Sequence, residues 1–392
     1  MQKLSNEERR RRLAVRHHLA PEWLASDATA AAGAQVGIHA SDPTSVYLAL
    51  RARVGGLAPA DVEQALYADR SVLKLLGMRR TMFVVPRDLA VVINSAATTT
   101  IAARERRRTI DLLRSANVVE GDVEAWLSQV EAETVAALDE LGEATASQLT
   151  KRVAGLRVQI PFGEGKKWAG TVGVSTRMLF LLAAEARIIR GRPQGGWTSS
   201  LYRWAPMTAW LGQPLGTQPT ADAQADLARR WLETYGPGRL RDLQWWAGWT
   251  VAETKKALTA ARAVEVGLDD GTGWAAGNDS APTPEGKRWI ALLPALDSTT
   301  MGWNERAWFM GDHTPRLFDR NGNAGPTVWL DGRVVGGWAH RPDGEVVFRL
   351  LEDVGAEARR EVEAQAQAVA GWLGPTRVVP RFRTPLEQEL SA

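Results

Sequence analysis

Three polar side chains stand within four positions of one another near the N-terminus, and their types suit the handling of a water molecule. They are His39, Ser41 and Asp42. A neutral imidazole can accept a proton from water or hold the water by a hydrogen bond. A hydroxyl can hold the same water as a second anchor, and a carboxylate can stabilise a nearby cation or orient the imidazole. The segment therefore predicts a hydrolytic site.

The same segment also suits an ordinary helix start. An N-cap aspartate followed by proline at the first helical position is a common beginning of an α-helix. Asp42 and Pro43 stand directly before an amphipathic stretch that predicts a helix over 44–54. Asp42 therefore has a structural interpretation beside the catalytic one. The same holds for His39, because a single histidine near a helix start is often part of the framework.

The middle of the chain predicts an element that would bring such a site to a nucleic acid. A helix over 147–153, capped by Thr145 or Ser147, precedes a second helix over 171–184 with apolar residues at helical spacing. The stretch 186–204 then predicts a β-hairpin. Together these elements predict a winged helix, whose second helix can enter a major groove while the hairpin touches the backbone or the minor groove.

This predicted hairpin is basic. Its cations are Arg187, Arg190, Arg192 and Arg203. Arginines that neutralise phosphates supply most of the affinity of a protein for DNA, so we predict that these four contact DNA.

Two weaker helix-and-hairpin units flank the middle one. In the first, strands over 72–76 and 80–85 are joined by a turn where Arg79 and Arg80 could grip phosphates. In the third, helices over 221–263 precede a hairpin over 264–276, whose turn is acidic and is therefore expected to pack against protein.

The last hundred residues have a different pattern. Short strands joined by turn residues are predicted over 290–294, 327–330, 334–339 and 346–351, with a helix over 356–372. We interpret this region as a small β-barrel or a curled sheet, covered by one helix. The predicted fold class is α+β, with three tandem winged helices and a C-terminal barrel. The expected domains are 1–115, 116–215, 216–285 and 286–392.

Charge is distributed unevenly along the chain, although the net charge is only +3. Residues 1–110 hold 17 Lys and Arg against 10 Asp and Glu, which gives +7, and residues 151–204 hold 10 against 2, which gives +8. Residues 111–150 hold 1 against 9, which gives −8. Two basic blocks around an acidic helical segment suit a polyanionic partner, although solvated helix faces would also produce them.

Several classes of site are excluded by composition. The absence of cysteine excludes disulfides, zinc–thiolate sites and thiol nucleophiles. No nucleotide-binding fingerprint appears, and His17 and His18 lack partners at metal-ligand spacing, so we expect no cofactor and no metal, with both histidines at the surface or facing DNA. No apolar run is long enough to cross a membrane, and the polar N-terminus lacks a signal peptide. The expectation is a cytoplasmic, nucleoid-associated monomer.

Four segments together resemble a known family, the AlkZ/YcaQ-type DNA glycosylases. They are 37–43 (GIHASDP), 78–81 (MRRT), 292–297 (LLPALD) and 326–338, and the last two are fairly specific. The resemblance covers most of the chain. It implies tandem winged helices curled around DNA, followed by a β-barrel, and it implies the removal of bulky or crosslinked alkylated bases.

The chain departs from this family at the catalytic motif. The family has glutamine, an apolar residue, and then glutamine or aspartate; here His39, Ala40 and Ser41 occupy those positions. Gln35 is out of register and a poor substitute. A histidine with the ordinary pKa of about 6.5 would lose activity as the pH falls through that value. Asp297 lies outside the motif and is expected to be structural, capping a turn or bonding Arg306 or Arg333.

The resemblance implies a monofunctional DNA glycosylase. Its substrates would be bulky N7- or N3-alkylated purines in duplex DNA, removed for repair or for self-resistance to a DNA-alkylating natural product. Two alternatives stay open at this point. The loss of both motif glutamines favours a non-catalytic DNA-binding protein, such as a regulator or lesion sensor. The 17 tryptophans would also suit a protein-binding scaffold.

Overall fold

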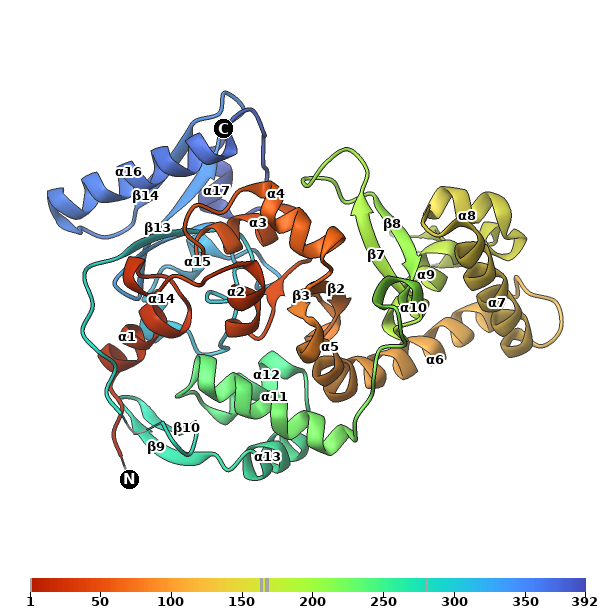
Figure 1. Ribbon diagram of the computed structural model, residues 1–392, viewed down its shortest axis with the longest axis horizontal. Helices are drawn as coiled ribbons and strands as arrows, with labels where there is room; N and C mark the ends of the chain where they lie inside the picture. The colour runs from red at the N-terminus through yellow and green to blue at the C-terminus, as the bar shows by residue number, and fades with distance from the viewer. Residues whose placement is uncertain (1, 163–164, 166–168, 280) are drawn as a thin grey trace.

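The computed structural model describes residues 2–162, 165, 169–279 and 281–392. Figure 1 shows elements from the two ends of the chain lying together, while α6 leads away from them to α7 and α8 at one side of the molecule. One large core joins residues from Leu13 to Leu390. Segments far apart in the sequence therefore meet around the site described below.

A three-stranded antiparallel sheet with the order β1-β3-β2 forms the first unit. The prediction for β2 is confirmed, and every residue of that strand is buried. The next strand begins at Met82 rather than 80, because Arg79 and Arg80 adopt left-handed backbone angles in the turn, with φ of 52° and 63°. The elements of this unit are α1 (Asn6–Arg16), α2 (Ala28–Ala34), β1 (Ile38–His39), α3 (Pro43–Arg51), α4 (Pro59–Glu63), β2 (Val72–Leu76), β3 (Met82–Pro86) and α5 (Arg87–Ile93).

The second unit has its own apolar core. Thr145 caps α8 as expected, in a capping box with Gln148. The second helix begins only at Val174, because the preceding glycine-rich stretch pairs as strand β6 with β5. The elements are α6 (Thr99–Ala116), α7 (Val123–Leu141), β4 (Ala144–Thr145), α8 (Ala146–Arg152), β5 (Gln159–Phe162), β6 (Gly170–Gly173), α9 (Val174–Ala184), β7 (Ile188–Pro193), β8 (Tyr202–Pro206) and α10 (Met207–Leu211).

The third unit contains three helices and a hairpin. As expected from its acidic turn, the hairpin packs against protein: Leu4 donates a backbone hydrogen bond to Gly267 and joins a small core with Val266 and Leu268. The elements are α11 (Thr220–Tyr235), α12 (Leu240–Ala247), α13 (Val251–Ala260), β9 (Val264–Leu268) and β10 (Gly271–Ala275).

The C-terminal strands form a four-stranded antiparallel sheet in simple sequence order. Within the described residues, no pairing joins its first strand to its last, so the predicted closed barrel is not confirmed. The predicted covering helix is present as α16, whose buried residues recur every three or four positions. The elements are β11 (Ile290–Leu293), α14 (Ala307–Met310), α15 (Thr314–Leu317), β12 (Thr327–Leu330), β13 (Arg333–His340), β14 (Val346–Leu350), α16 (Gly355–Leu373) and α17 (Pro385–Leu390).

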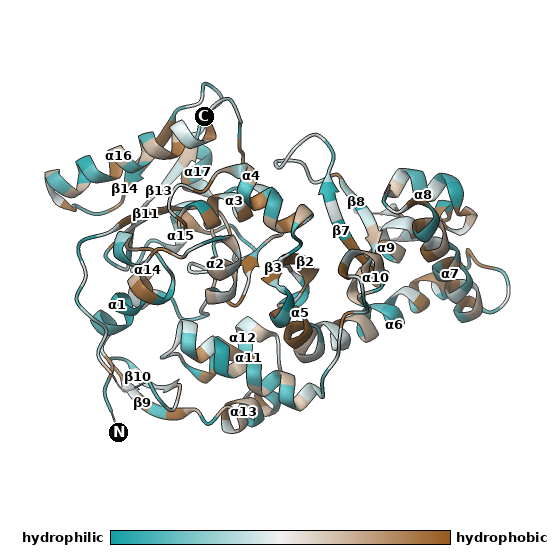
Figure 2. Ribbon diagram, viewed as in Figure 1, coloured by the Kyte–Doolittle hydropathy of each residue, from teal (hydrophilic) through white to brown (hydrophobic). Residues whose placement is uncertain are grey.

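The hydropathy of the helices differs with their place in the fold. Helices α1 and α8 are largely hydrophilic, whereas α5, which packs on β2 and β3, is largely apolar (Figure 2). Within the described ranges, no helix is both long enough and apolar enough to cross a membrane. The assignment of the three helix-and-hairpin units as winged helices, and the domain boundaries near 115, 215 and 285, stay predictions.

Candidate active site

The predicted water-handling segment begins on the edge strand of the first sheet. β1 pairs with β3, so that His39 lies opposite Phe83, and the backbone N–H of Ala40 donates to the carbonyl of Met82 at 2.7 Å. The rings of His39 and Phe83 lie 5.3 Å apart in an edge-to-face arrangement. Strand pairing therefore fixes the backbone of the segment as far as Ala40.

His39 is buried, with an exposed fraction of 4%. Burial, reinforced by the nearby charge of Arg79, lowers the pKa of His39 to about 3. Its Nδ1 atom is buried and has no hydrogen-bond partner among the described residues. The imidazole is therefore neutral throughout the physiological pH range, and the expectation of an ordinary pKa near 6.5 is wrong because the ring is desolvated.

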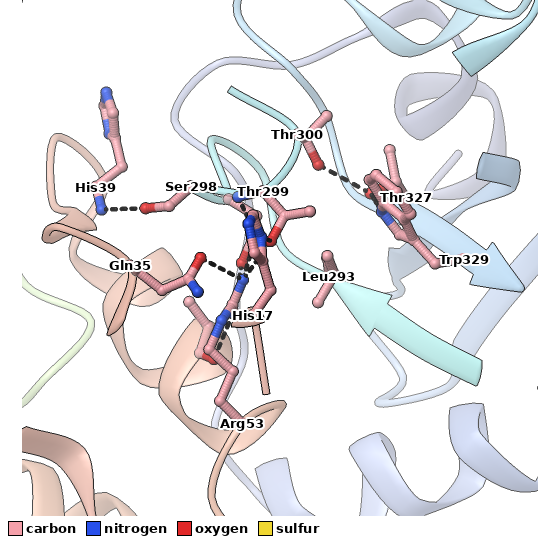
Figure 3. Close-up of polar contacts among 12 residues, drawn as sticks. His17, Gln35, His39, Arg53, Leu293, Ser298, Thr299, Thr300, Thr327 and Trp329 are labelled. Atoms are coloured by element: carbon pink, nitrogen blue, oxygen red, sulfur yellow. Dashed lines mark hydrogen bonds and ion pairs between the residues drawn. The ribbon is translucent and has the colours of Figure 1, made fainter. Parts of the chain in front are cut away.

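A loop from the C-terminal region holds this segment. The Oγ atom of Ser298 accepts a hydrogen bond from the backbone N–H of His39 at 3.1 Å and donates to the carbonyl of Gly37 at 2.9 Å. In Figure 3 the imidazole of His39 points away from Ser298, so the loop fixes the backbone and leaves the ring free of it. Ser298 was not predicted, and nothing in the sequence near position 298 signals this contact.

The loop is anchored by an ion pair in the protein interior. Arg53 and Asp297 are both fully buried, and the guanidinium donates to both carboxylate oxygens, at 2.7 and 2.9 Å. Asp297 also accepts from the backbone N–H of Thr299. The expected structural role of Asp297 is confirmed. The expected partner is wrong, because Arg53 reaches this carboxylate from the turn after α3, and neither Arg306 nor Arg333 pairs with it.

Two polar residues of the N-terminal region belong to the same interior network (Figure 3). Gln35 accepts a hydrogen bond from Arg53 through its side chain and from Tyr235 through its backbone carbonyl, and it is fully buried. His17 is also fully buried, between the hydroxyl of Thr299 and the carbonyl of Thr234, and burial lowers its pKa well below the usual range. The prediction of a surface or DNA-facing His17 is therefore wrong.

Ser41 lies at the edge of an open cleft of about 660 Å³. Its Oγ accepts a hydrogen bond from the backbone N–H of Met82 at 3.4 Å. The cleft is lined by side chains from several parts of the chain, including Ser41, Ser147, Thr176, Phe180, Arg190, Tyr202 and Arg381. The tertiary structure thus brings Ser41 beside α9 and the basic hairpin of the second unit.

Asp42 is occupied by hydrogen bonds within the protein. One carboxylate oxygen accepts from the backbone N–H and the hydroxyl of Thr44, and the other accepts from the backbone N–H of Arg381 at 2.8 Å. The side chain caps α3 and ties it to the C-terminal segment. This geometry favours the structural interpretation of Asp42.

The candidate DNA-binding arginines of the first hairpin turn differ in their surroundings. Arg80 is exposed, forms an ion pair with Glu105 and lies over the ring of Phe180. Arg79 is half-buried, lies 3.8 Å from the ring centroid of Trp245 and makes no hydrogen bond or ion pair with any described residue. Only Arg79 thus keeps its cationic groups free of protein acceptors.

The tip of the second hairpin is docked on protein. The tip residue Trp197 lies against Tyr47 of α3, with the two rings 4.7 Å apart and tilted by 31°, and it contacts Trp372 of α16 edge to face. Arg192 forms an ion pair with Glu63 from the first unit. These partners are remote in the sequence, so the pattern of the hairpin alone did not reveal them.

The remaining arginines of this hairpin divide into three kinds. Arg187 forms an ion pair with Glu131 at 3.0 Å. Arg190 is half-buried over the rings of Tyr202 and Trp204 and lines the cleft beside Ser41. Arg203 is exposed and has no ion pair with a described residue.

Lys74 is a buried cation that sequence reasoning missed. Its ammonium lies 3.3 Å from the hydroxyl of Tyr202, and burial together with the charge of Arg190 lowers its pKa to about 7. The sequence hinted at this burial, because Lys74 is the single charged residue within the apolar strand Val72–Leu76. No group of three or more His, Cys, Asp or Glu side chains in the described part of the chain could hold a metal ion.

Comparisons with known proteins place the chain in a family. The family model described as DNA glycosylase AlkZ-like matches residues 32–372. The solved structure of the Streptomyces sahachiroi DNA glycosylase AlkZ is 19% identical, with a TM-score of 0.71, over 95% of this chain and 97% of that one, and it shows the same mixed α and β fold. No curated protein matches the chain. Because the family model spans most of its length, the chain belongs to the AlkZ-like DNA glycosylase family and is a DNA glycosylase.

Proposed function

We propose that this protein is a monofunctional glycosylase that hydrolyses the N-glycosidic bond of bulky N7- or N3-alkylated purines in duplex DNA. Its role would be repair or protection against a DNA-alkylating natural product. The observation that carries the proposal is the cleft beside Ser41, whose volume of about 660 Å³ leaves room for an everted nucleotide with a large adduct.

Cleavage of the glycosidic bond of an alkylated purine needs little catalytic assistance. Alkylation at N7 or N3 gives the purine a positive charge, so the base leaves readily and the sugar develops oxocarbenium character. Water then bonds to the anomeric carbon as the bond to the base breaks, and the water loses a proton. The protein must expose the nucleotide and place that water.

A permanently neutral His39 fits the placing of water better than strong base catalysis. A group whose pKa is about 3 is a weak base, but a neutral imidazole can still hold a water molecule by a hydrogen bond. In our proposal Ser41 provides the second anchor. Asp42 positions both residues by capping α3 and does not touch the substrate.

The direct test is excision itself. Purified protein incubated with duplex DNA containing an N7-alkylguanine should produce alkali-labile abasic sites under single-turnover conditions. Activity should survive EDTA, because water activation in this proposal needs no metal. A panel of small and bulky N7 and N3 adducts then reports size preference. If small adducts are excised and bulky ones stay intact, the proposed substrate range is wrong although the enzyme class stands.

A further inference from the structure

Two arginines and a tryptophan from three separate parts of the chain meet at the turn between β2 and β3. Arg79 lies in the turn between β2 and β3, Trp245 lies on α12, and Arg306 stands directly before α14. The guanidinium carbons of Arg79 and Arg306 lie 3.8 and 4.9 Å from the ring centroid of Trp245, and Arg306 also lies over Phe318. Arg79 is the charged group that acts on the imidazole of His39.

Neither arginine has an anionic partner. Among the described residues, no hydrogen bond or ion pair reaches either guanidinium, and both Nε atoms are buried without a partner. Some buried arginines of this protein do have such partners: Arg53 pairs with Asp297, and Arg12 pairs with Asp279. Arg9 and Arg190 also lie over aromatic rings without an ion pair to a described residue. Within the described residues, however, only Arg79 and Arg306 place two guanidiniums over one ring.

Their arrangement is electrostatically unfavourable as it stands. Burial lowers the pKa of each arginine to about 10, and the charge of Arg306 lowers that of Arg79 further. Both stay charged at neutral pH. The acid that acts on Arg306 is Asp242, but its oxygens accept from the backbone N–H groups of Arg239, Asn304 and Glu305. An anion from outside the protein would relieve this repulsion.

The backbone holds Arg79 in place at a cost. Arg79 and its neighbour Arg80 are consecutive non-glycine residues with positive φ, a strained conformation that concentrates at functional sites. Gly248 after α12 packs so closely that an added Cβ would lie 3.3 Å from the Cγ atom of Arg79. The turn is therefore clamped against the third unit with its guanidinium on Trp245.

We propose that Arg79 and Arg306, stacked on Trp245, bind one backbone phosphate of DNA next to the nucleotide whose glycosidic bond meets His39. This rests on the proposed function only in that the ligand is DNA. Two planar guanidiniums suit a phosphate because each can donate paired hydrogen bonds to its oxygens. The site would link the first unit, the third unit and the C-terminal region to one point of the DNA backbone.

The test removes single phosphate charges. Duplexes carry one tetrahydrofuran abasic-site analogue, which cannot be excised, and one neutral methylphosphonate placed at successive positions around it. For the wild-type protein, one position near the analogue should weaken binding about 10-fold to 100-fold, the range of a charge-assisted hydrogen bond. In Arg306→Gln and Arg79→Gln that position should lose its effect, while methylphosphonates elsewhere keep theirs.

Controls separate this result from misfolding and from failed catalysis. Arg306→Lys keeps the charge and loses the planar fork, so it should restore part of the sensitivity. Arg359→Gln, on the exposed face of α16, should give the wild-type profile. Thermal unfolding checks the fold of each variant. Because binding is measured on DNA that cannot be excised, the outcome does not depend on whether any lesion is removed.

Two outcomes would overturn the proposal. One is a wild-type methylphosphonate profile in both glutamine variants. The other is inhibition of DNA binding by millimolar inorganic phosphate, at constant ionic strength, with no sensitive methylphosphonate position. That second pattern would assign the arginine pair to a small free anion instead of the DNA backbone.

Discussion

His39 combines a position suited to catalysis with an environment that keeps it uncharged. Its ring is buried against Phe83 and close to the cation Arg79, and both effects oppose protonation. The residue can act only as a neutral hydrogen-bonding group. Two predictions follow from this single property, one for the rate and one for stability.

His39 itself should contribute no pH dependence to the excision rate between about pH 5 and 8. With a pKa of about 3, His39 stays neutral over this whole range, so no loss near pH 6.5 is expected. His39→Ala should slow the chemical step, toward the low end of the ~10²–10⁴-fold range for a general base, because the cationic base leaves easily. His39→Gln should keep more activity than His39→Ala, and Ser41→Ala should lose less. Single-turnover rates check each variant; a decline of the wild-type rate through pH 6.5 that His39→Gln does not show would contradict the role of burial.

Protein stability should fall on acidification because of the same burial. The pKa of His39 is lower in the folded state than the ~6.5 of the unfolded chain, so the unfolded state binds the proton first as the pH falls. The contribution of His39 to the free energy of unfolding is fully present above about pH 6.5. It is lost progressively as the pH falls toward 3, at up to about 1.4 kcal/mol per pH unit. Urea unfolding at pH 7, 6 and 5 measures the slope. In His39→Gln the slope of the free energy of unfolding against pH should be smaller by about that amount. Equal slopes in the two proteins would refute the lowered pKa of His39.

At the scale of elements, a two-residue strand is held by a loop from the far end of the chain. β1 is too short to be stable alone, and the hydroxyl of Ser298 completes its hydrogen bonding opposite β3. The loop in turn depends on the buried pair of Arg53 and Asp297. The site therefore depends on long-range tertiary contacts, although its motif is contiguous in the sequence.

Removing one member of this ion pair should be far more damaging than removing the hydroxyl. Asp297→Ala leaves Arg53 charged and buried without its partner, which costs about 3–5 kcal/mol. Ser298→Ala deletes two buried hydrogen bonds and should cost about 1–3 kcal/mol, with a lower excision rate because His39 is less firmly placed. Chemical denaturation ranks the variants. If Asp297→Ala were no less stable than Ser298→Ala, the pair would not anchor the loop.

On the scale of the whole molecule, the docked hairpin changes which arginines are available to DNA. Arg192 already pairs with Glu63, and Trp197 fixes the tip between α3 and α16. Arg203 is exposed and forms no ion pair with any residue that the structure describes. Contact with DNA is therefore expected from part of the hairpin and not from all four of its arginines.

The salt dependence of DNA binding should separate these residues. Arg203→Ala should reduce the slope of log affinity against log salt by about one and weaken binding across sequences. Arg192→Ala should leave the slope nearly unchanged, because its charge is already matched within the protein. Titrations of duplex DNA at several salt concentrations give both slopes. The opposite ranking would mean that the pair of Arg192 and Glu63 opens on DNA.

The sequence by itself determined most of the local structure, because strands, helices and caps depend on neighbouring residues. β2 and the helices α8, α13 and α16 lie close to their predicted positions, and Thr145 and Asp42 act as caps. The resemblance of the segments 37–43, 78–81, 292–297 and 326–338 to a known family also pointed to DNA glycosylases, and the family model confirms that family.

Only the tertiary structure decided which side chains meet and which are desolvated. Arg53 reaches Asp297 across 244 positions, Ser298 reaches His39 across 259, and the sequence contains no local trace of either contact. Burial made His17 and His39 neutral and left Arg79 and Arg306 without counter-ions. Long-range packing sets the dielectric surroundings of a group, and those surroundings, rather than residue type, determine its charge.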